Sequence, residues 1–101
     1  MSPAIVVFQH LAAREFRKAH RWYGERSVEV AERFRLAVDR ATERMAADFE
    51  ALPTIVGQYR RVRVSKFPYL LIARRKNPSL VMVVAVAHAH RRPGYWRRRD
   101  T

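Results

Sequence analysis

Four arginines and a tyrosine in the second half of the chain could handle phosphate groups. They are Arg61, Arg63, Arg74, Arg91 and Tyr95. A guanidinium group is always charged and can make two parallel hydrogen bonds, which suits it to clamping a phosphate. The phenol of Tyr95 could stack on a nucleobase or donate a proton. The same arginines would also suit a solvated surface or a surface that binds a partner protein.

Two histidines, His88 and His90, stand two residues apart at the end of an apolar stretch. If this stretch is a strand, both imidazoles point to the same face. Such a pair could begin a metal site or act as general acid and base. Residues 51–101 contain no cysteine and a single acid, Asp100, so a third metal ligand is hard to supply. We therefore expect no metal and no cofactor, and a hydrogen-bonded structural pair of histidines.

Basic residues are concentrated in one half of the sequence. The formal net charge is +12. Residues 1–50 hold nine Arg or Lys against eight Asp or Glu, whereas residues 51–101 hold twelve against one. Such asymmetry favours an anionic partner, which could be RNA, DNA or an acidic protein. Trp96 lies among the arginines of the tail and should anchor that tail to the core, with partner contact as the alternative. The further candidates for partner binding are Arg60, Lys66, Arg92, Trp96 and Arg97.

The length of 101 residues suits one hydrophobic core, so residues 1–101 are expected to form a single domain. The absence of cysteine excludes disulfides and thiolate chemistry. The longest apolar run, residues 81–87, is far shorter than the roughly 20 residues of a membrane-spanning helix. The N-terminal residues lack the basic and apolar regions of a signal peptide. These features predict a soluble cytoplasmic protein without a membrane association.

The first half of the chain has the pattern of one strand and two helices. Residues 4–8 are β-branched and aromatic, as in a strand. Apolar residues then recur at spacings of three and four in two segments, which predicts an antiparallel helical hairpin. Gly24 should end the first helix, Ser27 should cap the second, and Pro53 should stop it soon after Phe49. The aromatic residues expected in the core are Phe16, Trp22 and Tyr23.

The second half has the pattern of three strands. Residues 58–65 alternate, so that Arg61 and Arg63 should face away from Val62 and Val64. Residues 69–75 form the next predicted strand, and residues 76–79 its hairpin turn. Residues 80–89 are almost entirely apolar, as in a strand covered on both faces. The predicted fold class is α+β with the order β-α-α-β-β-β, an antiparallel-rich twisted sheet with the helical hairpin on one face.

This plan resembles the RelE/ParE superfamily of bacterial toxins over almost the whole chain. The similar segments are Trp22-Tyr23 at the end of the first helix, Tyr59-Arg60-Arg61-Val62-Arg63, Phe67-Pro68-Tyr69 and the segment from Val84 to Trp96. The last of these is most similar to the ParE-labelled branch. The resemblance implies the toxin of a type II toxin–antitoxin (plasmid stabilisation) system, which forms a hetero-oligomer with a cognate acidic antitoxin.

Two activities are implied by the resemblance, and both arrest growth. ParE-like members interfere with DNA gyrase, whereas RelE-like members cleave mRNA on the ribosome. Cleaving members tend to carry Lys or Glu just before the second strand, where this chain has residues 51–56 with only Glu50 nearby. The ParE-like activity is therefore favoured, with mRNA cleavage as the alternative, and an inactive toxin relic or a basic nucleic-acid-binding domain as a third possibility. Toxicity is expected to depend on the arginines and not on a chemical step at Tyr95.

Overall fold

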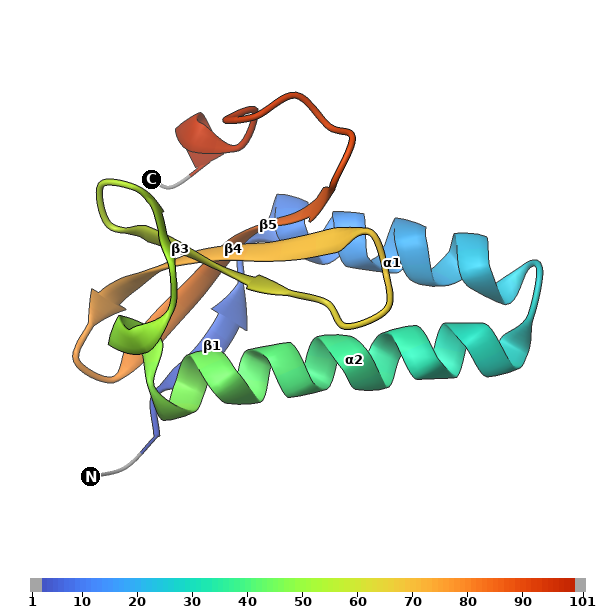
Figure 1. Cartoon of the computed structure of the whole chain (residues 1–101), viewed down its shortest axis with the longest axis horizontal. Helices are drawn as coiled ribbons and strands as arrows, with labels where there is room; N and C mark the ends of the chain where they lie inside the picture. The colour runs from blue at the N-terminus through green and yellow to red at the C-terminus, as the bar shows by residue number, and fades with distance from the viewer. Residues whose placement is uncertain (1–2, 100–101) are drawn as a thin grey trace.

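The structure is a computed structural model, and it describes residues 3–99. Asp100, the one acid of the second half, lies outside these residues. The elements in chain order are β1 (Ile5–Phe8), α1 (His10–Gly24), α2 (Val28–Ala47), the 3-10 turn η1 (Phe49–Ala51), β2 (Thr54–Val56), β3 (Tyr59–Arg63), β4 (Tyr69–Asn77), β5 (Leu80–His88) and the 3-10 turn η2 (Arg97–Arg99). Figure 1 shows the helices packed side by side against a sheet. In the part of the chain that the structure describes, no helix combines the length and apolar character needed to span a membrane.

Within residues 3–99 the strands form one five-stranded sheet with the order β1-β5-β4-β3-β2. β1 is parallel to β5, and the other neighbouring pairs are antiparallel. β5 is an interior strand, which confirms the position predicted from its apolar composition. The α+β class and the helical hairpin on one face are also confirmed.

One strand was missed by the sequence analysis. β2 lies at the edge of the sheet and pairs with β3, where the sequence suggested only a connection. Its three residues follow Pro53 directly and are too few to display the alternation of a strand. Gly57, at φ +54°, takes a left-handed conformation in the turn to β3. The observed order is therefore β-α-α-β-β-β-β.

Side chains cap both helices at their N-termini. The Gln9 side-chain oxygen accepts hydrogen bonds from the backbone N–H groups of Leu11 and Ala12 at the start of α1. The Ser27 hydroxyl accepts from Val30 N–H at 3.2 Å, which confirms the predicted cap of α2. Gly24 is the last residue of α1, as predicted.

The main core lies between the helical hairpin and one face of the sheet. Phe34 is fully buried, with its ring stacked on Phe16 and in contact with Tyr23, Phe67 and Tyr69. Phe16 and Tyr23 pack against the core, as the helical spacing predicted. Trp22 does not: the residue is 51% exposed, so its assignment to the core was wrong.

The C-terminal tail, residues 89–99, covers part of the other face of the sheet. Trp96 is only 3% exposed and belongs to a second cluster with residues of β4 and β5. Its ring meets the ring of Tyr59 at 4.7 Å between centroids. In Figure 1 the tail runs along the side of the sheet away from α2. Trp96 therefore anchors the tail, as the sequence analysis expected.

Candidate functional site

Three of the predicted arginines lie on the tail side of the sheet. In the strand register Arg61 is opposite Ile72, Arg63 is opposite Leu70, and Arg74 is opposite Met82. Directly paired residues point to the same face, and those three partners pack in or against the cluster beneath the tail. Val62 and Val64 are buried on the helix side, so the predicted alternation of β3 is confirmed.

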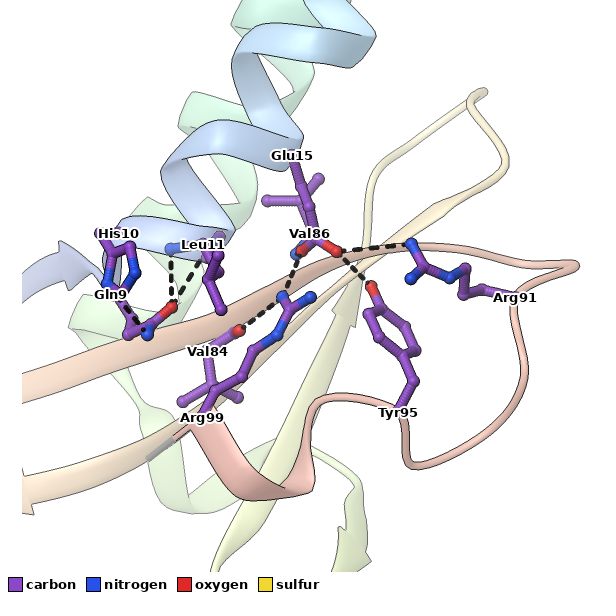
Figure 2. A network of polar contacts seen from close by, with 10 residues as sticks. Gln9, His10, Leu11, Glu15, Val84, Val86, Arg91, Tyr95 and Arg99 are labelled. Atoms are coloured by element: carbon purple, nitrogen blue, oxygen red, sulfur yellow. Dashed lines mark hydrogen bonds and ion pairs between the residues drawn. The ribbon is translucent and has the colours of Figure 1, made fainter. Parts of the chain in front are cut away.

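A carboxylate from α1 joins the tail to the sheet (Figure 2). Glu15 Oε2 accepts a hydrogen bond from the Tyr95 hydroxyl at 2.7 Å. Its Oε1 accepts from Arg99 Nη1 at 2.8 Å and from the backbone N–H of Val86 at 3.0 Å. Arg91 Nη1 is 3.8 Å from Oε2. The side chains of Glu15 and Arg99 are only 16% and 14% exposed, so their ion pair is largely shielded from water.

The environment of Tyr95 limits what its hydroxyl can do. Burial and the hydrogen bond to Glu15 raise the pKa of Tyr95 above the usual range for tyrosine. The Arg91 guanidinium lies over the Tyr95 ring at 4.0 Å, and that of Arg99 lies at 4.8 Å. The phenol is therefore a weak proton donor whose hydrogen is directed at a carboxylate. Through its hydrogen bond to Glu15, the hydroxyl instead connects the tail to α1.

A cleft of about 480 Å³ opens between α1, the start of β4 and the end of β5. Trp22 and Tyr69 contribute aromatic walls, and Lys18, His88 and Arg91 contribute basic groups. The Arg26 guanidinium lies over the exposed Trp22 ring, 3.6 Å from the ring centroid. An aromatic cleft with basic groups can accept an apolar side chain or a base next to an anionic group.

His88 and His90 lie next to each other, as predicted from their spacing, with ring centroids 5.2 Å apart. His88 Nδ1 accepts from the backbone N–H of His90 at 3.1 Å, and the His88 ring also meets Tyr69. Within residues 3–99 no three metal-binding side chains converge on one point. The geometry fits a structural pair beside the cleft.

The remaining candidates are spread over the molecule. Arg60 donates from Nη1 to the carbonyl oxygens of Glu50 and Leu52 at 3.0 and 2.8 Å, so it fastens the chain before β2. Lys66 is exposed in the turn between β3 and β4, where it has a φ of 70°. Arg92 and Arg97 are exposed on the tail. The structure thus brings Arg91 and Tyr95 together but leaves Lys66 and Arg60 outside that group.

Glu15 and Arg99 were not among the residues predicted from the sequence. Glu15 stands three residues after Ala12 and four before Ala19, two buried positions of α1, so it shares the stripe that faces the sheet. An acid within an apolar stripe, in a chain whose residues 51–99 contain no acid, was a usable signal. Arg99 gave no signal, because it is one of three consecutive arginines.

A helical hairpin on one face of a mixed sheet, with a basic tail on the other, is the architecture of a small RelE/ParE-like toxin. A sequence model of the family described as "ParE toxin of type II toxin-antitoxin system, parDE" matches residues 6–93. The chain belongs to this family, and it is the toxin of a type II pair whose partner is an antitoxin protein. A search of curated proteins found no matching relative. The match ends before Tyr95, Trp96 and Arg99.

Proposed function

We propose that this toxin arrests growth by binding DNA gyrase on DNA, without a chemical step of its own. The observation that carries the proposal is the state of Tyr95. Its hydroxyl donates to Glu15, and its pKa is raised, which makes it unsuited to protonating a leaving group. The toxin and its antitoxin would both be cytoplasmic. The toxin would stay in a hetero-oligomer with its antitoxin and would act once the antitoxin is lost.

Glu50, the acid nearest to the expected catalytic region, is also engaged. Arg75 donates to its two carboxylate oxygens at 2.8 and 3.0 Å. The hydrogen-bonded Arg75 guanidinium lowers the pKa of Glu50, although burial opposes this. A carboxylate stabilised in its charged form is a weak general base. This supports binding over RNA cleavage.

Arg61, Arg63 and Arg74 would supply the contact with DNA. They share the tail side of the sheet, and guanidinium groups bind backbone phosphates without reading sequence. This fits a toxin that stabilises a gyrase–DNA complex on many sequences. The same arginines are also compatible with the alternative, ribosome-dependent mRNA cleavage, because they could equally hold an RNA phosphate.

The test compares the two targets directly. The purified toxin is added to gyrase with supercoiled plasmid, and separately to ribosomes translating a defined mRNA. We expect gyrase-dependent DNA breaks and intact mRNA. Replacing Arg61 and Arg63 together by Ala should weaken the effect by roughly tenfold or more, the loss expected for charge-assisted contacts. A matched control replaces Arg14 and Arg17, two exposed arginines of α1. Cleaved mRNA with unaffected gyrase would establish the alternative activity, and no effect on either target would favour an inactive relic.

A further inference from the structure

The edge of β5 changes its partner halfway along the strand. β1 pairs only with Leu80–Val83, and the last contact of this ladder is the hydrogen bond from Gln9 N–H to the Val83 carbonyl at 2.9 Å. After Gln9 the chain turns into α1. Backbone groups of β5 beyond this point therefore need other partners.

Glu15 and Arg99 supply those partners. The Glu15 carboxylate accepts from the Val86 N–H, and Arg99 Nη1 donates to the Val84 carbonyl at 3.3 Å. The two side chains are themselves paired at 2.8 Å. An acceptor and a donor thus meet the strand edge where β1 has ended, as Figure 2 shows. Breaking the pair would leave a largely buried charge and open backbone groups.

Glu15 also contacts the tail at more than one residue. Tyr95 and Arg99 both donate to Glu15, and the buried Trp96 lies between them in sequence. Arg91 is placed by the same group, since it lies over the Tyr95 ring and near Glu15. Arg91 also lines the aromatic cleft. Arg91 therefore belongs both to the contacts around Glu15 and to the lining of the cleft.

We propose that Glu15 is a positioning residue for toxicity: it latches the tail across the open edge of β5 and so fixes Arg91 beside the cleft. The inference rests on the proposed function only in requiring a toxin that acts through its basic surface. It applies whether the target is gyrase or the ribosome. Glu15 also lines the cleft, but in this scheme it contacts neither target and acts through the tail.

Docking of the tail can be measured separately from toxicity. The chain has two tryptophans, so Trp22→Phe leaves Trp96 as the only one. In this background, acrylamide quenching and the emission maximum report whether Trp96 is covered. Glu15→Gln should increase quenching and shift the emission to the red, while circular dichroism shows an intact helical hairpin. Glu43→Gln, which neutralises an exposed carboxylate of α2, is the matched control and should change neither signal.

Toxicity is then measured with Trp22 in place, as loss of colony formation after induction. Losing a charge-assisted contact shifts an equilibrium by roughly tenfold or more, so Glu15→Gln should weaken growth arrest by at least that factor. Glu43→Gln should leave growth arrest unchanged. Glu15→Asp, which keeps the charge, should restore part of the arrest.

Three results would overturn the latch: full toxicity with a released tail, lost toxicity with a docked tail, or a tail that stays docked without Glu15. If Glu15→Gln fails to fold, Tyr95→Phe and Arg99→Lys each weaken one arm, and a graded loss in both assays is then expected. The proposal would be rejected if both variants loosened the tail and were still as toxic as the unmodified protein. If gyrase is unaffected by the toxin but Glu15→Gln still lowers growth arrest and releases the tail, the gyrase proposal fails and the latch stands.

Discussion

The hydroxyl of Tyr95 is a small group with a defined structural use. It makes a 2.7 Å hydrogen bond to a carboxylate that also pairs with Arg99. A hydrogen bond to a charged group contributes about 1.5–3 kcal/mol, more than a bond between neutral groups at a surface. The sequence led us to expect no chemical step at Tyr95 in toxicity. The geometry gives its hydroxyl a structural role instead, in the bond to Glu15.

Tyr95→Phe therefore distinguishes binding from chemistry only when two quantities are measured together. Phenylalanine keeps the ring beneath Arg91 and loses the bond to Glu15, so we expect a loosened tail and growth arrest reduced by roughly ten- to a hundredfold. Colony formation and Trp96 quenching are the measurements. A proton donor would behave differently, since its loss costs roughly 10²–10⁴ in rate. Growth arrest abolished while the tail remains docked would support a chemical role for Tyr95.

At the scale of elements, one fully buried ring lies between the two helices and the sheet. Phe34 of α2 contacts aromatic residues from α1, from β4 and from the turn before β4. Phe34→Ala should lower the free energy of unfolding by roughly 3–5 kcal/mol, because it leaves a cavity that rigid neighbours cannot fill. Chemical denaturation measures this, with Leu36→Ala, an exposed position of the same helix, as the control. A loss below about 1 kcal/mol would show that the hairpin does not depend on this contact.

Local patterns in the sequence predict most of these elements. Spacings of three and four locate α1 and α2, and alternation locates β3, because both are periodicities of a single segment. Trp96 was predictable as an anchor, since a large ring among arginines needs cover. Trp22 was not predictable: its helical spacing resembles that of core residues, but it lies beside an open cleft that only the assembled fold creates.

The latch was beyond prediction for a related reason. Glu15 meets partners 71, 80 and 84 residues away, and no periodicity connects positions so distant. In addition, the backbone of β5 needs the Glu15 carboxylate only because β1 ends early, and where β1 ends is a property of the whole sheet. Arg61, Arg63 and Arg74 could be grouped in advance only in part: alternation puts Arg61 and Arg63 on one face, whereas the register with β4 and β5 adds Arg74.

At the scale of the whole molecule, the uneven charge of the sequence becomes uneven charge in the fold. Residues 1–50, which include the helical hairpin, carry nine Arg or Lys against eight Asp or Glu. Arg35 of α2 pairs with Glu32 and Asp39. The strands from β3 onward and the tail hold the excess of positive charge. Two acids of the first half form ion pairs with arginines of the second half: Glu50 with Arg75 and Glu15 with Arg99. We expect an acidic antitoxin to be attracted to the surface formed by these strands and the tail.

Association with the antitoxin should therefore be electrostatically steered. The rate of association should fall as salt rises from low to high concentration, by roughly tenfold or more, because exposed charges are screened within about 10 Å at 0.1 M. Arg61→Glu or Arg63→Glu should slow association more than Arg14→Glu, which makes the same change in net charge on α1. Stopped-flow mixing with the purified antitoxin at several salt concentrations measures both effects. Equal slowing by all three variants would mean that only total charge matters, because a local surface must be more sensitive to its own residues. A rate independent of salt would place the main contact on apolar surface, for which the cleft beside Trp22 is the part of the fold to test next.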